Sequence, residues 1–231
     1  MKRFIVLALV LCIAALGHAQ NEDYRSTVSL NVGYGITNIA SFALNTLNDS
    51  IAGSETFKAS SLPQLSLNYD YGIKPRFSVG GSIAYARLSA KDDDYSTYVT
   101  DSLGNDVFKS GGYSATASRV SVGVRGLFHY GNSDKLDMYS GLRLGANFWS
   151  LAAESDVFVE SDLPEQLSAR ATSVTLNYHL ILFGLRGYLT DNIGLGFEIC
   201  TLGAPHIVAA NINYRFLETV VDICRNNMRR T

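Results

Sequence analysis

The chain lacks any hydrophobic run long enough to cross a bilayer as a helix, which takes about 20 residues. It is also poor in charge, with 17% Asp, Glu, Lys and Arg against roughly 25% in ordinary soluble domains. Only three cysteines are present, too few for a disulfide-bonded scaffold, so we expect Cys200 and Cys224 to be free thiols. Low charge without a helical span points to apolar surface that is distributed over strands.

The first residues have the pattern of a secretory signal peptide. Lys2 and Arg3 precede a 13-residue apolar core, and small residues end the segment at Ala19. We therefore expect residues 1–19 to be cleaved off and the protein to be exported. The mature chain then carries 17 basic and 21 acidic residues, a formal charge of −4, and no basic run with interleaved aromatics. No nucleic-acid partner is expected.

Apolar and polar residues alternate with a period of two in eight segments, as in half-buried β-strands. In one of them Leu65, Leu67 and Tyr69 alternate with Ser66 and Asn68. The segments are residues 28–36, 64–73, 77–85, 119–130, 137–148, 173–189, 193–200 and 208–216.

The sixth segment breaks the rule, because Arg186 falls on its apolar face. One extra residue in a strand exchanges its two faces, so we expect a β-bulge between His179 and Gly184.

The connections between segments alternate in length. The joins after the second, fourth and sixth segments are tight, whereas those after the first, third and fifth each exceed 20 residues. Short turns on one side and long loops on the other, with an even strand count, are typical of outer-membrane barrels. The polar face is rich in Gly, Ser, Ala and Asn, which suit a narrow interior. The sequence thus predicts an eight-stranded antiparallel up-and-down transmembrane β-barrel over residues 20–216, in contact with outer-membrane lipid.

The last segments carry a family resemblance in residues Leu185 to Gly194 (LRGYLTDNIG), in Glu198, and in residues Asn211 to Phe216 (NINYRF). These residues resemble the closing hairpins of the small outer-membrane β-barrel family, the OmpA/OmpX-like barrels often labelled "porin family". The resemblance covers about residues 20–216. It implies insertion by the barrel-assembly machinery, which reads a terminal strand that ends in an aromatic residue, here Phe216. Family members usually stop at that aromatic, whereas this chain continues through residues 217–231.

The inward face of the predicted barrel carries charges that need partners, because enclosed charges are costly unless paired. Arg125, Arg143 and Glu198 fall at about one height, so we expect Glu198 to bridge one or both arginines. Lesser members of the network are Asp70, Asp137, Arg119 and Arg215. The network acts either as a structural plug, which we favour because narrow interiors are normally filled, or as a gate or ion path.

Catalytic, metal and cofactor sites have little support. His129 and His179 lie on predicted strands without a matching nucleophile, and Asp92 to Asp94 are consecutive instead of spaced as in a calcium loop. We therefore expect no enzyme and no cofactor. The favoured role is structural or surface-interactive, with a possible surface or periplasmic protein partner. Three alternatives stay open: a narrow passive channel, a lipid-modifying enzyme, and a soluble periplasmic ligand-binding barrel.

The tail, residues 217–231, places Leu217, Val221, Cys224 and Met228 on one helical face. It is expected to form a short helix at the periplasmic rim or a disordered end.

Overall fold

The computed structural model describes residues 25–52, 55–100, 104–130, 133, 135–155 and 171–217. The expected signal peptide and residues 218–231 of the tail lie outside these ranges. Within them, no helix is both long and apolar enough to traverse a bilayer.

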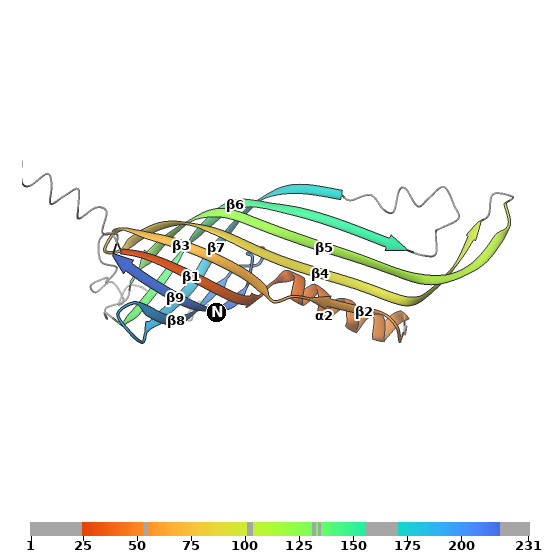
Figure 1. Ribbon diagram of the computed structural model, residues 1–231, viewed down its shortest axis with the longest axis horizontal. Helices are drawn as coiled ribbons and strands as arrows, with labels where there is room; N and C mark the ends of the chain where they lie inside the picture. Colours follow the sequence, from red (N-terminus) through yellow and green to blue (C-terminus); the bar gives the residue numbers. More distant parts are fainter. Residues whose placement is uncertain are drawn as a thin grey trace, which may run out of the picture.

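Eight of the described strands form a closed antiparallel ring, in which β1 pairs with both β3 and β9, and β4 with β5 (Figure 1). This arrangement confirms the predicted eight-stranded barrel. The ring strands are β1 (Arg25–Tyr34), β3 (Gln64–Lys74), β4 (Phe77–Thr100), β5 (Asp106–His129), β6 (Leu136–Ser155), β7 (Ala171–Tyr188), β8 (Ile193–Cys200) and β9 (Val208–Leu217).

The two faces of the ring carry opposite kinds of side chain. Outward-pointing Leu67, Val122 and Leu144 are 47%, 47% and 48% exposed. Arg125 and Glu198 point inward and are 2% and 0% exposed. A soluble barrel would show the reverse, so the barrel has the inside-out distribution of a membrane protein.

The irregularity predicted in the sixth strand is present in β7. Its pairing with β8 passes from Ile181↔Cys200 to Phe183↔Ile199, so β7 contains one extra residue at this point. A matching shift occurs in its pairing with β6. Before the bulge the inward residues of β7 have odd numbers, and after it they have even numbers. Arg186 is therefore buried inside the barrel.

Three strands continue well past the ring. β4 and β5 have 24 residues each and β6 has 20, whereas β1 has 10 and β8 has 8. Since about 10 tilted residues cross a bilayer, these strands extend the sheet beyond the membrane (Figure 1). The long connection after the third segment is mostly a continuation of the β4–β5 hairpin, whose last pair is Thr100↔Asp106.

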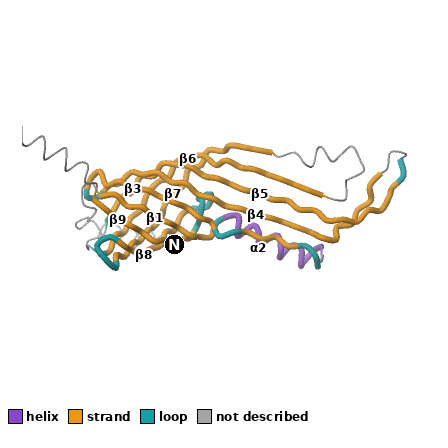
Figure 2. The backbone as a smooth tube through the Cα atoms, viewed as in Figure 1, coloured by secondary structure: helices purple, strands orange, loops and turns teal. Residues whose placement is uncertain are grey.

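The first predicted long loop also contains regular structure: α2 (Ile36–Leu47), a π-helical turn η1 (Asn48–Ala52) and the short strand β2 (Lys58–Ser61). β2 pairs with β4, and α2 lies along this extension (Figure 2). Ser41 and Asn45 of α2 donate to the Ala59 carbonyl at 3.0 and 2.8 Å, and the Asn45 side chain accepts from the Ala59 N–H at 2.7 Å. The polar face of α2 therefore supplies hydrogen-bond partners for the backbone N–H and C=O of Ala59 on the outer edge of β2.

Close packing inside the barrel requires a glycine at position 184 of β7. A Cβ atom there would overlap the ring of Tyr139, which is paired with Gly184 on the neighbouring strand β6 and points into the interior. At Gly126, on the outward face of β5, an added Cβ would meet nothing within 4 Å.

We expect Gly184→Ala to displace Tyr139 and to destabilise the barrel by about 1–3 kcal/mol, the usual cost of overpacking. Gly126→Ala is the matched control and should leave stability nearly unchanged. The measurement is the temperature at which the compact barrel band converts to the unfolded band on a gel. Equal transition temperatures for the two variants would contradict the close contact.

Candidate functional site

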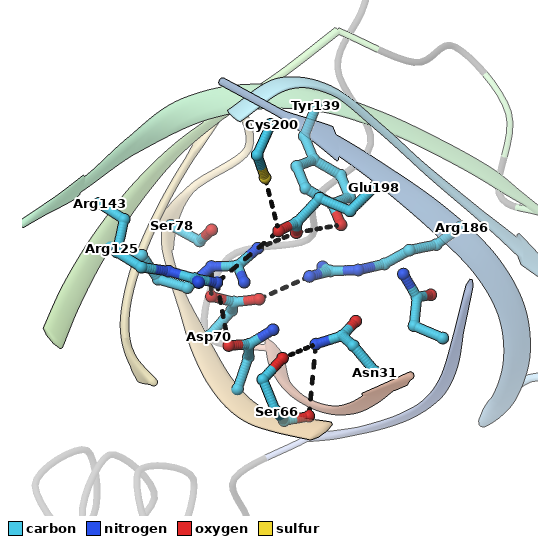
Figure 3. Close-up of polar contacts among 12 residues, drawn as sticks. Asn31, Ser66, Asp70, Ser78, Arg125, Tyr139, Arg143, Arg186, Glu198 and Cys200 are labelled. Carbon is cyan, nitrogen blue, oxygen red and sulfur yellow. Dashed lines mark hydrogen bonds and ion pairs between the residues drawn. The ribbon is translucent and has the colours of Figure 1, made fainter. Parts of the chain in front are cut away.

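The candidate site is the charged centre of the barrel interior, built from side chains of β3, β5, β6, β7 and β8 (Figure 3). Arg125 of β5 and Arg143 of β6 are directly paired neighbours, so their two guanidinium groups lie side by side. Such an arrangement needs carboxylates to offset the repulsion, because water is excluded here. Glu198 of β8 and Asp70 of β3 supply them, and both are buried.

Arg125 links the two carboxylates. Its Nη2 lies 2.9 Å from Glu198 Oε2, and its Nε lies 3.0 Å from Asp70 Oδ1. Arg186 Nη2 binds the other Asp70 oxygen at 2.5 Å. Arg143 Nη2 donates to Asn68 Oδ1 at 3.2 Å and lies 3.7 Å from Glu198 Oε1. Glu198 is therefore close to both arginines named by the sequence hypothesis, with Arg125 the nearer.

Tyr139 fills the space between these ion pairs. Its hydroxyl donates to Glu198 Oε2 at 3.0 Å, and the Arg186 guanidinium carbon lies 4.4 Å from the centre of its ring. The contact with Arg186 is a cation–π interaction in a desolvated setting. Sequence reasoning left both residues out of the network. The expected bulge already implied an inward Arg186. Tyr139 lies on the same face of its strand as Asp137 and Arg143, so it could have been predicted to point inward.

A second polar cluster lies toward the short turns and includes Asp137. His129 Nδ1 lies 2.7 Å from Asp137 Oδ1, and Ser78 Oγ lies 2.8 Å from His129 Nε2. Arg186 Nη1, 3.5 Å from Asp137 Oδ2, connects this cluster to the centre. Asp137 is thus a partner of both His129 and Arg186.

Ser78, His129 and Asp137 have the connectivity of a hydrolase triad, in which an acid orients a base that contacts a hydroxyl. No sequence pattern predicted this arrangement, because Ser78, His129 and Asp137 lie on the three strands β4, β5 and β6 and only the strand register brings them together. Ser78 is 3% exposed, so its hydroxyl is covered by the barrel wall and its neighbours.

Arg119 and Arg215, the two lesser arginines of the predicted network, contact backbone carbonyls in the structure. Arg119 Nη2 donates to the Pro205 carbonyl at 3.2 Å and to Gln64 Oε1 at 3.3 Å. Arg215 Nε donates to the Asp191 carbonyl at 2.6 Å. Within the described residues neither has an ion pair with a carboxylate. The predicted inward direction of both side chains is correct. Both arginines lie near the ends of the barrel, too far along their strands to reach its centre.

The connector between β8 and β9, residues 201–207, turns into the barrel on the long-loop side. Ala204 and His206 are both 0% exposed, and His206 Nε2 reaches Glu198 Oε1 at 3.1 Å. Potential ligand atoms of Glu198, Cys200 and His206 lie within 4.8 Å of one another, so these three side chains could hold a metal ion. No pattern in the sequence predicted a role for this connector.

Phe216 is the second-last residue of β9 and pairs with Ser26 of β1. Its ring stacks on that of Tyr214 with centres 5.9 Å apart. The aromatic residue thus ends the strand that closes the ring, and its role as an assembly signal stays a prediction.

We expect Glu198→Gln to destabilise the barrel strongly, because it removes one of the two carboxylates paired with Arg125 and the carboxylate that lies 3.7 Å from Arg143. Breaking a buried pair in this way costs about 3–5 kcal/mol. Glu154→Gln, which changes an exposed acid at the end of β6, is the matched control and should be nearly neutral. Thermal conversion followed by gel migration measures both. If the two variants convert at the wild-type temperature, the network is not a stabilising core.

In comparisons with known proteins, no protein-family model matches the chain, and no curated protein matches it. Among solved structures, the chain is similar to the attachment invasion locus protein Ail of Yersinia pestis, with 14% identity, 84% of this chain and 100% of that chain covered, and a TM-score of 0.42. It is also similar to the outer membrane protein OprG of Pseudomonas aeruginosa, with 12% identity, coverage of 88% and 99%, and a TM-score of 0.39. A third is the outer membrane protease OmpT of Escherichia coli, with 12% identity, coverage of 84% and 90%, and a TM-score of 0.33. At these identities the similarity concerns the fold alone.

Proposed function

We propose that the protein is an integral barrel of the bacterial outer membrane with a structural or surface-contact role, and that its interior is a plug and not a path. The observation that carries this proposal is the filled centre of the barrel. Arg125, Arg143, Arg186 and Tyr139 are each no more than 2% exposed, although they are among the largest side chains in the chain. Large buried residues that bind one another across the interior leave little room for solute.

Closure at the long-loop end supports the same role. The β8–β9 connector is tied to the wall by the bond from Arg119 to the Pro205 carbonyl and by the bond from Ile207 N to Tyr34 O, 2.8 Å. His206 extends from this connector to Glu198 in the centre. The connector is therefore part of the filling of the barrel.

The extension of β4, β5 and β6 supports a role outside the membrane. Along the outward face of β4 the side chains change from apolar Ile83 and Tyr85 to exposed Arg87 and Lys91. This change places the border of the apolar band near Tyr85, so the rest of the hairpin extends into water. We propose that this part of the sheet contacts a protein partner at the cell surface.

We expect the purified barrel to show no steady single-channel conductance in a planar lipid bilayer, because the central side chains and the connector block the interior. A characterised porin, reconstituted in the same way, is the positive control. A reproducible ohmic conductance from the wild-type barrel would favour the alternative, a narrow passive channel.

We also propose that the barrel has no hydrolase activity, despite the Ser78, His129 and Asp137 contacts. A fluorophosphonate probe should not label Ser78 in the folded barrel, because the hydroxyl is covered. Ser78→Ala serves as the control for labelling of other residues. Labelling of the folded wild type that disappears in Ser78→Ala would show an accessible nucleophile and support the lipid-modifying enzyme instead.

A further inference from the structure

The structure assigns a buried site for one divalent transition-metal ion of the zinc type to Glu198, Cys200 and His206, and we propose that this ion fastens the β8–β9 connector to the barrel wall. Glu198 and Cys200 are inward neighbours on β8, two residues apart, and His206 reaches them from the connector. All three are at most 2% exposed. The site is independent of the role proposed above.

The spacing of the three ligand atoms fits a tetrahedral ion. Cys200 Sγ lies 3.4 Å and His206 Nε2 lies 3.1 Å from Glu198 Oε1, and all three atoms lie within 4.8 Å of one another. With zinc bonds of about 2.3 Å to sulfur and 2.0 Å to nitrogen or oxygen, tetrahedral angles separate the same atom pairs by about 3.5 and 3.3 Å. Only small side-chain shifts are therefore needed to admit the ion.

The mixture of thiol, imidazole and carboxylate also selects the type of ion. Magnesium and calcium prefer oxygen ligands alone, whereas zinc accepts sulfur, nitrogen and oxygen together. On binding, the metal–sulfur bond replaces the thiol S–H bond of Cys200, and one proton is released to solvent. The His206 ring binds through Nε2 and carries its proton on Nδ1.

His179 of β7 is an independent indication of a missing ligand. It is 2% exposed, and neither of its ring nitrogens has a hydrogen-bond partner among the described residues. Buried polar atoms in native structures nearly always have a partner, so this one needs an explanation. His179 shares the inward face of β7 with Ile181, which pairs with Cys200, and is therefore one pleat from the thiol. His179 lies outside the group whose ligand atoms are within 4.8 Å of one another, and we propose that its ring turns toward the ion to take the fourth position.

The arginines around Glu198 are compatible with the ion. Arg125 and Tyr139 bind Oε2, the oxygen that faces away from Cys200 and His206. Metal-ligating carboxylates usually have such outer partners, which hold them in orientation. Arg143, 3.7 Å from Oε1, has Asn68 as a second partner at 3.2 Å. Its guanidinium can therefore retain a hydrogen bond while Oε1 turns to the metal.

The test uses the full mature barrel, treated with a chelator and then titrated with Co²⁺. We expect a near-ultraviolet thiolate-to-cobalt charge-transfer band that saturates at one equivalent and disappears when Zn²⁺ is added. Cys200→Ser should lose the band, and His179→Gln should weaken Co²⁺ binding at least about tenfold. Cys224→Ser, which changes the other thiol of the mature chain, is the matched control and should retain the band.

A second measurement separates metal binding from misfolding. Each variant is first shown to migrate as a compact band that heat converts to the unfolded form. Zn²⁺ should then raise the conversion temperature of the wild type and of Cys224→Ser, but not that of Cys200→Ser or His206→Gln. The proposal is overturned if the folded wild type gives no charge-transfer band, if the band persists in Cys200→Ser, or if it is lost in folded Cys224→Ser.

Discussion

Charge enclosed by the barrel must be paired within it, and this requirement organises the interior. Glu198 and Asp70 together contact three guanidinium groups, and Arg125 binds both carboxylates. Desolvated charges of this kind are tolerated only when geometry and additional hydrogen bonds offset the loss of water. Tyr139 provides part of that compensation through its hydroxyl and its ring.

The network connects strands that are distant in the chain. The bond from Arg186 to Asp70 spans 116 residues and joins β7 to β3 across the interior. These contacts depend on the ring being closed, since only closure places opposite walls face to face. Barrel closure and charge pairing are therefore mutually dependent, and contacts of such long range are expected to form late and slowly during folding.

The backbone groups at strand edges find their hydrogen-bond partners differently inside and outside the membrane. In the ring, closure leaves no unpaired strand edge, which is the condition for a β-structure in lipid. In the extension β2 has an outer edge, and Ser41 and Asn45 of α2 satisfy its backbone. The alternation of apolar and polar residues predicted the ring but not α2, because a pattern with a period of two identifies strands and not helices.

The sequence by itself determined the architecture: strand number, inward and outward faces, the bulge before Arg186, and the inward position of Glu198, Arg125 and Arg143. These follow from periodicity, which is a local property that each strand carries along its own length. Only the tertiary structure decided which inward residues meet. Arg119 and Arg215 have the right parity but lie too near the ends, whereas Ser78 and His129, or Cys200 and His206, come together through strand register and an inward turn of the connector. Position along the barrel axis and contacts across its interior depend on closure of the whole ring, and no local pattern contains that information.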